Sequence, residues 1–318
     1  MIHASGRPTA RRTRFAISLP QFVGDGAFDP ARFRAHVARA EALGFDSAWT
    51  QEQVLGSMPH LGPIETMTYA AACTERLRLG CAVFVLPLHS PVHLAKSLST
   101  LDQLSRGRLE IGVGIGGRRM FSAFAVDPDR LVTRFVEGLQ LMKALWTEPR
   151  VTFKGRFWQL DGATMEPKPF QKPYPPIWFG AAHPNAVRRA VRHGDGFFGA
   201  GSQTTARFAE QVRILRDALE ERGRSAGGFR IAKRVYIAVD DDARRARQRG
   251  MAVLQALYRR AVPRDLEAVA VFGPPRACVD GLREVVEAGA EMILLTPPFD
   301  EAAQMERLAA EVIPRVLE

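Results

Sequence analysis

Residues Leu77 to Gly117 read LRLGCAVFVLPLHSPVHLAKSLSTLDQLSRGRLEIGVGIGG, and this stretch decides the fold. An apolar run is followed by a segment with apolar residues at helical spacing, and then by a second apolar run that ends in glycines. A strand, a helix and a second strand within about forty residues form one unit of a parallel sheet. A glycine turn at the end of a strand lets backbone N–H groups approach an anion. The stretch therefore predicts half of a binding site for a phosphate-bearing cofactor.

The same alternation continues along the whole chain. Short runs rich in Val, Ile and Phe alternate with longer amphipathic segments, which is typical of a parallel sheet covered by helices. Eight runs are candidate strands, at residues 15–19, 46–50, 79–86, 109–114, 177–180, 196–200, 234–239 and 292–297. Eight is the strand number of the (β/α)8 TIM barrel, so we predict an α/β protein of that type.

The rest of the chain divides into a tail, a domain and an insertion. Residues 1–14 are rich in arginine, and we expect them to form a disordered basic tail. Residues 15–318 contain no linker rich in Pro, Ser or Gly, so we expect a single domain. Between the fourth and fifth strands, residues 148–176 show a hairpin pattern followed by prolines. This insertion either covers one rim of the barrel or acts as a substrate lid.

Composition indicates a globular protein with a large core. The chain has 318 residues, of which 46% are hydrophobic and 25% charged. Three widely spaced cysteines favour neither a disulfide framework nor a metal site, and they indicate a reduced, cytoplasmic setting. No apolar run approaches the length of a membrane span. The apolar residues that follow Arg11 and Arg12 are interrupted at Pro20, too early for an export signal.

The net charge of +10 raises the question of a nucleic-acid partner. Four arginines lie in the tail, and most of the others stand singly beside acidic residues on predicted helices. This distribution favours a solvated basic surface and no nucleic-acid binding. Attraction of a polyanionic cofactor is the functional alternative.

Five segments carry a resemblance to a known family. They are LGFDSAW (43–49), the stretch 79–117, PPIWFGAAHP (175–184), RHGDGFF (192–198) and AGAEMILLTP (288–297). Through their order and spacing, the chain from about Arg14 onward resembles the bacterial-luciferase-like flavin-dependent oxidoreductases, including those that use coenzyme F420. The resemblance implies a (β/α)8 barrel with F420, or alternatively FMN, in its mouth.

The resemblance also implies which residues hold the cofactor. Ala82 and Val83 match a bulge that backs the redox ring, often with a non-proline cis peptide. Two turns of small residues match those that lie along the phosphate and tail of the cofactor. They comprise Gly114, Gly116 and Gly117 after the fourth strand and Gly180, Ala181 and Ala182 after the fifth.

The second strand ends in WTQEQV, where the chain departs from the family pattern. Many F420-dependent members have an acid that bonds the ring, followed by a histidine that acts near the reacting carbon. Here these positions are Glu52 and Gln53, so we expect both to contact the ring and Glu52 to be catalytic. A glutamine cannot shuttle a proton near neutral pH. His60 and His89 lie within reach of the rim, and His60 is our candidate for the missing proton donor.

The resemblance implies a hydride transfer between F420 and a small organic substrate. One alternative is an FMN-dependent monooxygenase that uses oxygen, and another, suggested by Gln53, is a protein that binds a flavin without turnover. In the branch that oxidises sugar phosphates, a glutamate stands at the position of Gly117 and a lysine at that of Gln203. These differences argue against a phosphorylated sugar as substrate. Many relatives dimerise, so a homodimer is also expected.

Overall fold

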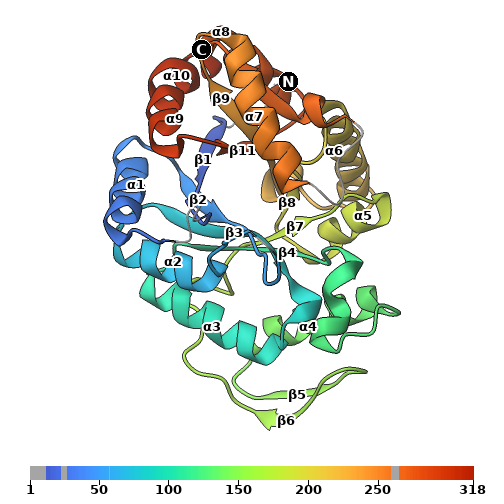
Figure 1. The fold of residues 1–318 in the computed structure, drawn as a ribbon. Helices are drawn as coiled ribbons and strands as arrows, with labels where there is room; N and C mark the ends of the chain where they lie inside the picture. Colours follow the sequence, from blue (N-terminus) through green and yellow to red (C-terminus); the bar gives the residue numbers. More distant parts are fainter. Residues whose placement is uncertain (1–11, 23–26, 57, 259–264) are drawn as a thin grey trace, which may run out of the picture.

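The computed structural model describes residues 12–22, 27–56, 58–258 and 265–318. In this part of the chain, eight parallel strands form a closed barrel; they are β1 (Arg14–Ser18), β2 (Ser47–Thr50), β3 (Arg78–Val85), β4 (Leu109–Gly114), β7 (Ile177–Gly180), β8 (Gly196–Gly199), β9 (Arg230–Val239) and β11 (Met292–Thr296). They pair in this order, and β11 closes the ring on β1. Figure 1 shows the barrel inside a ring of helices. The predicted (β/α)8 fold is confirmed.

The start of β9 and one additional strand are the main differences from the prediction, and the other strand boundaries agree to within one residue. The strand β9 begins at Arg230 rather than Arg234, because the charged Lys233 interrupts the apolar pattern although its side chain is buried. A further strand, β10 (Ala270–Gly273), pairs with the end of β9 outside the barrel. Arg14, assigned to the tail, is the first residue of β1 and pairs with Asp46. Residues 1–11 of the predicted tail lie outside the described residues.

Most of the longer helices begin at a proline or after a residue whose side chain caps the helix. Proline occupies the first turn of five of the longer helices, where its missing N–H is not needed. The helices are α1 (Pro30–Ala42), α2 (Pro63–Ala72), α3 (Pro91–Leu104), α4 (Leu131–Thr147), α5 (Pro184–His193), α6 (Thr205–Glu220), α7 (Ala243–Leu257), α8 (Pro275–Glu287), α9 (Glu301–Arg307) and α10 (Ile313–Val316). Shorter turns are η1 (Leu86–Leu88), η2 (Arg118–Phe124), η3 (Ala226–Gly228), η4 (Leu266–Val269) and η5 (Leu308–Val312).

The insertion at residues 148–176 packs on the outside of the barrel. It contains an antiparallel hairpin of β5 (Val151–Lys154) and β6 (Gln159–Ala163), which Figure 1 shows beyond α3 and α4. Its proline-rich part is held by α3, where Ser99 donates to the carbonyl of Pro167 at 2.5 Å and Gln103 donates to that of Lys168 at 2.7 Å. No residue of the insertion lines the cleft at the barrel mouth described below. The lid interpretation therefore finds no support in this arrangement.

The interior of the barrel is filled by an aromatic plug. Trp49, Trp178 and Phe198 meet edge to face with ring centroids 4.8–5.9 Å apart. Glycines on neighbouring strands make room for these rings, because a Cβ on Gly80 would lie 2.5 Å from Trp49. The indole N–H of Trp178 donates to the fully buried carboxylate of Glu110 at 2.5 Å. The plug closes the barrel below its mouth, so a ligand must bind above it, at the carboxyl ends of the strands.

Candidate cofactor cleft at the mouth of the barrel

A cleft of about 630 Å³ lies at the carboxyl ends of the strands. This volume is within the range of cofactor sites, about 300–1,000 Å³. Small and apolar residues make up most of its wall, with polar side chains at its two ends. The lining residues include Gln51, Ala82, Val83, Gly114, Gly116, Gly180, Ala181, Ala182, Arg189, Ser202, Arg234, Tyr236 and Tyr258.

Most of the residues predicted to hold the cofactor line this cleft. The structure brings together Ala82 and Val83 from β3 with the small-residue turns after β4 and β7. Four predicted residues do not line the cleft: Glu52, Gln53, His60 and Gly117.

The glycines around Val83 have a packing role that the sequence did not reveal. A non-proline cis peptide joins Ala82 to Val83, at the point where the pairing of β3 with β4 shifts register. The Val83 side chain lies between two glycines: a Cβ on Gly114 would be 2.7 Å from Val83 Cγ2, and one on Gly180 would be 2.8 Å from Val83 Cγ1. These two glycines therefore accommodate Val83 in the cleft wall. Gly117, in contrast, has open space where a Cβ would stand.

Arg234 is the main charged group at one end of the cleft. Its guanidinium donates to the carbonyl of Ala82 at 3.1 Å and to Oε1 of Gln51. Only 8% of Arg234 is exposed, and no acidic residue of the described chain forms an ion pair with it. Burying an unpaired charge is unfavourable unless a ligand compensates it. Sequence reasoning missed Arg234, although a charged residue in the apolar run RVYIAV was an available signal.

Glu52 stabilises the exit of β3 rather than facing the cleft. Its carboxylate accepts the backbone N–H of Val85 at 2.6 Å and contacts Nε2 of His89 at 2.8 Å. The side chain is 3% exposed. Gln53 folds over Gly56, where an added Cβ would lie 1.9 Å from Gln53 Nε2. Both residues therefore shape the loop after β2, and their predicted contact with the ring stays a prediction.

His60 is partly buried beside the mouth of the barrel. Its ring meets Phe22 edge-on, with centroids 4.6 Å apart, and neither ring nitrogen has a hydrogen-bond partner within the described residues. Burial, together with the nearby Arg234, lowers the pKa of His60 to about 4. The imidazole is therefore neutral at pH 7 and is a poor proton donor there.

The opposite end of the cleft is suited to an anion. Gln211 donates to the carbonyls of Ala181 and Ala182 at 3.3 Å each, which orients this turn at the start of α5. No described residue accepts a hydrogen bond from the backbone N–H groups of these two alanines. Arg189 projects from α5 into the cleft without an ion-pair partner in the described chain, and burial and the neighbouring Arg192 lower its pKa. Free N–H groups at a helix start, with an unpaired cation, fit a phosphate.

A basic groove of about 780 Å³ continues from this end. It shares Arg189 with the cleft, and its charged lining residues are Lys154, Arg188, Arg189, Arg192, Arg222, Glu137 and Glu221. Glu221 pairs with Arg188 at 2.8 Å. The Glu137 carboxylate accepts hydrogen bonds from the backbone N–H groups of residues 156–158 at 2.8–3.0 Å. The groove therefore keeps an excess of positive charge next to the phosphate end of the cleft.

Lys233 holds the loop after β8 that forms another part of the wall. Its ammonium group donates to the carbonyls of Gln203 at 2.8 Å and Ala200 at 3.2 Å, and only 2% of the residue is exposed. Burial lowers the pKa of Lys233 to about 8. The loop that this ammonium fixes includes Gly201 and Ser202, which line the cleft.

The described residues contain neither a metal-binding cluster nor a membrane-spanning helix. Among them, no group of three His, Cys, Asp or Glu side chains could hold a metal ion. None of the described helices is long and apolar enough to cross a membrane.

Comparison with known proteins places the chain in a family. Residues 13–292 match the sequence profile of luciferase-like monooxygenases. An F420-dependent glucose-6-phosphate dehydrogenase of Kineococcus radiotolerans is 27% identical over 345 residues, covering 99% of each chain. The monooxygenase RslO1 of Streptomyces bottropensis superposes with a TM-score of 0.81 at 25% identity, covering 95% of this chain and 99% of the other.

The fold extends to more distant enzymes. The F420-dependent tetrahydromethanopterin reductase of Methanopyrus kandleri has a TM-score of 0.79 at 20% identity, covering 96% of this chain and 99% of its own. That likeness concerns the fold alone. Together with the profile match, it agrees with the barrel described above. The chain therefore belongs to the luciferase-like monooxygenase family, which makes it an oxidoreductase with a flavin-type cofactor.

Proposed function

We propose that this protein is an F420-dependent oxidoreductase that transfers a hydride between the coenzyme and a small organic substrate. The observation that carries the choice of F420 is the basic groove beyond the phosphate end of the cleft. F420 bears a chain of carboxylates beyond its phosphate, whereas FMN ends at the phosphate. Unpaired cations such as Lys154 and Arg192 would stabilise the longer anionic tail.

The residues of the cleft fit this coenzyme from end to end. The wall at Ala82 and Val83 would back the ring, and the free N–H groups of Ala181 and Ala182, with Arg189, would bind the phosphate. When bound, F420 would supply the hydride exchange, while the protein supplies orientation and electrostatics.

Arg234 has the clearest electrostatic role in this proposal. A buried cation without an acidic partner would offset negative charge on a reduced ring in a site where solvent screening is weak. Gln51 holds the guanidinium in place from one side and the Ala82 carbonyl holds it from the other. The aromatic plug below the mouth excludes water from the barrel interior.

A second candidate is an FMN-dependent monooxygenase. The likeness to RslO1, a monooxygenase, favours it, and the cleft is also large enough for FMN. The two candidates differ in what they require of the basic groove, because FMN would leave it empty.

A titration with F420 and FMN tests the proposal through this difference. We expect the double variant Lys154→Gln/Arg192→Gln to weaken F420 binding about three- to tenfold, since each of these exposed charges contributes about 0.3–0.7 kcal/mol. FMN binding should change less than about twofold, because FMN ends at the phosphate and would not reach Lys154 and Arg192 in the groove. The matched control is Arg276→Gln, an exposed arginine on α8 away from the cleft. An equal loss for both cofactors, or no loss for F420, would contradict the assignment.

A further inference from the structure

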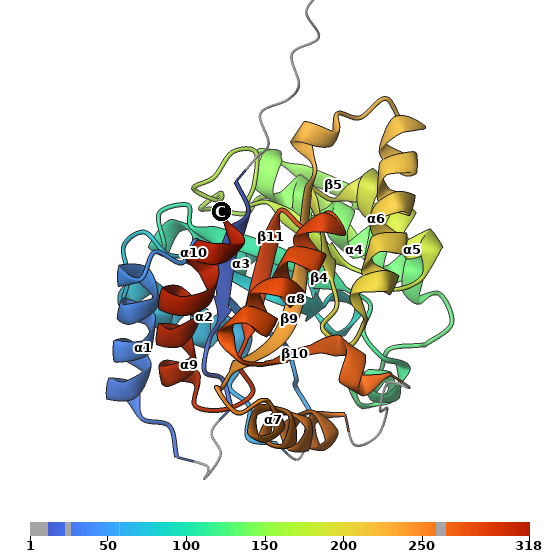
Figure 2. The same ribbon diagram turned by 90° about the horizontal axis from the view of Figure 1, so that it is seen from above.

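A second, smaller cavity lies beside the cofactor cleft. Its volume is about 140 Å³, and it is bounded by the ends of β1, β2, β9 and β11 and by one side of α7. Figure 2 shows α7 lying across this end of the barrel. The wall is mostly apolar, and its apolar residues include Leu19, Phe22, Trp49, Met58, Val253, Leu254, Leu257, Pro297 and Pro298. A cavity of about this size in an apolar core accommodates a molecule as large as benzene.

The cavity adjoins one end of the cleft. Three residues, Gln51, Arg234 and Tyr236, line both spaces. Arg234 also donates to the carbonyl of Ala82, so the shared wall stands at the segment of β3 that we assign to the redox ring. A molecule in the small cavity would therefore lie next to that end of the cofactor cleft.

Two polar groups on the wall of the cavity lack partners. The hydroxyl oxygen of Thr296, at the end of β11, is buried and makes no hydrogen bond in the described structure. Glu301, the first residue of α9, is partly buried, and its carboxyl group has neither a hydrogen bond nor an ion pair with any described residue. Buried polar groups are nearly always satisfied, so the unpaired Thr296 hydroxyl, with the unpaired Glu301 carboxyl group on the same cavity wall, indicates a ligand with a polar atom.

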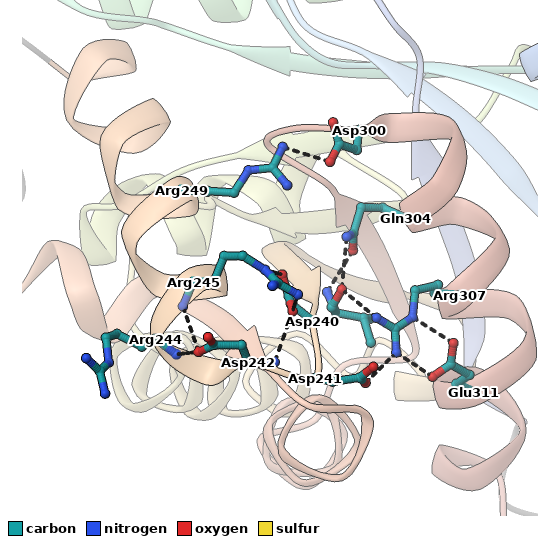
Figure 3. Close-up of polar contacts among 11 residues, drawn as sticks. Asp240, Asp241, Asp242, Arg244, Arg245, Arg249, Asp300, Gln304, Arg307 and Glu311 are labelled. Carbon is teal, nitrogen blue, oxygen red and sulfur yellow. Dashed lines mark hydrogen bonds and ion pairs between the residues drawn. The ribbon is translucent and has the colours of Figure 1, made fainter.

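Ion pairs and hydrogen bonds hold residues 300–307, the segment that carries Glu301, against the rest of the barrel. Figure 3 shows its contacts with α7 and the end of β9. Asp300 pairs with Arg249 of α7 at 2.7 Å. Gln304 accepts the N–H of Val239 at 2.7 Å and donates to its carbonyl at 3.0 Å, and Arg307 donates to Asp241 at 2.8 Å. Because these contacts fix both sides of α9, the position of Glu301 at the cavity wall is set by the fold.

We propose that this cavity is the substrate chamber, that it takes a small, neutral and largely apolar molecule with one oxygen acceptor, such as a cyclic ketone, and that Glu301 and Thr296 bind that oxygen. This assignment rests on the proposed function, because the chamber is defined by its position beside the cofactor cleft. Both groups can donate a hydrogen bond to a carbonyl, Glu301 in its acid form. The only cation that lines the chamber among the described residues, Arg234, is already bonded to Gln51 and Ala82. A phosphorylated sugar would bring a dianion next to the Glu301 carboxyl group, which disfavours it.

The protonation of Glu301 predicts how binding depends on pH. Burial raises the pKa of Glu301 to about 7, so the acid form is the main form below that pH. The charged and titratable groups that line the spaces on its two sides are Arg234, Tyr236, Asp29, Arg32, His36, Arg39, Asp300 and Glu306. Burial lowers the pKa of His36 to about 4, and Arg39 pairs with Glu306. Ketone binding should therefore be retained below pH 7 and should weaken as the pH rises through 7 to 8.

The test measures binding of cyclohexanone to the F420-loaded protein by calorimetry at pH 6 and pH 8. We expect tighter binding at pH 6, and an affinity about five- to tenfold lower in Glu301→Ala, the loss of one hydrogen bond to a partly buried acid. Glu301→Gln should keep binding but lose its pH dependence, because the amide donates at either pH. Leu254→Trp should block the chamber. The matched control is Glu306→Gln, on the same helix but outside the chamber.

The outcomes separate this inference from the proposed function. Unchanged cyclohexanone affinity in Glu301→Ala, or binding that survives Leu254→Trp, would overturn the chamber assignment while leaving F420 binding intact. If F420 fails to bind but cyclohexanone still binds to the protein with the expected dependence on Glu301, the proposed cofactor is wrong and the chamber stands. Binding of glucose 6-phosphate in place of the ketone would also overturn the assignment.

Discussion

Replacing Gly180 with alanine tests why the cleft wall is built of glycines. The new methyl carbon would lie 2.8 Å from Cγ1 of Val83, whereas apolar carbons pack best at about 3.5–4.0 Å. An overlap of this kind in a packed wall typically costs about 1–3 kcal/mol. Gly180 does not have a positive φ, so backbone strain adds nothing to that figure. We expect Gly180→Ala to lower the free energy of unfolding by about 2 kcal/mol.

Combining this change with Val83→Ala should reveal the contact directly. Val83→Ala alone removes apolar contacts from a partly exposed side chain, which costs about 1 kcal/mol. In the double variant the new methyl group occupies the space that Val83 vacates. The double variant should therefore be more stable than the sum of the single effects predicts, by about 1–2 kcal/mol.

Urea unfolding measures this cycle, and F420 titration of the same proteins separates two explanations. Gly117→Ala is the matched control, because its Cβ would meet nothing within 4 Å and its φ is −90°. Strictly additive effects of Gly180→Ala and Val83→Ala would refute the packing argument. If Gly180→Ala weakens F420 binding equally in the original protein and in the Val83→Ala variant, the glycine serves the approach of the cofactor instead.

Three further variants test supporting parts of the structure. Lys233→Met leaves the carbonyls of Ala200 and Gln203 without their donor, so we expect a loss of about 1–3 kcal/mol in urea unfolding and weaker cofactor binding; unchanged values would show that the loop holds itself. His36 has a pKa of about 4 when folded against 6.5 when unfolded, so its contribution to stability is complete above pH 6.5 and is lost as the pH falls towards 4. His36→Gln should flatten this acid dependence by about 2 kcal/mol at pH 5, and an unchanged slope from pH 7 to 5 would contradict it. Glu52→Ala leaves the Val85 N–H unpaired, so we expect about 1–3 kcal/mol lower stability, with weaker F420 binding as a consequence; weaker binding at unchanged stability would restore its predicted direct contact with the ring.

Local patterns were sufficient to predict the barrel. All eight barrel strands were predicted because buried parallel strands are continuous apolar runs bounded by turns. The early start of β9 was missed because Lys233 is charged and yet buried. Its ammonium group donates to three backbone carbonyls, two of them in the loop after β8, and no local pattern reveals these partners. The hairpin in the insertion was predicted, but its position outside α3 depends on contacts with side chains some seventy residues earlier, such as Ser99 with Pro167.

The candidate site was predictable only where it consists of backbone turns. The turns after β4 and β7 and the pair Ala82–Val83 line the cleft, because motifs at strand ends converge in any barrel. Side-chain roles depend on pairing in three dimensions. Glu52 is bonded to Val85 and His89, and the unpaired cation at that end of the cleft is Arg234, a residue of a strand almost two hundred positions away.

Hydride transfer to and from F420 can be tested on the protein directly. The most direct test mixes the protein holding reduced F420 with cyclohexanone under nitrogen and follows the absorbance of the oxidised coenzyme. We expect oxidised F420 to appear only when the ketone is present, without oxygen, together with one equivalent of the alcohol. Oxidation that requires oxygen and proceeds with reduced FMN but not with reduced F420 would contradict it.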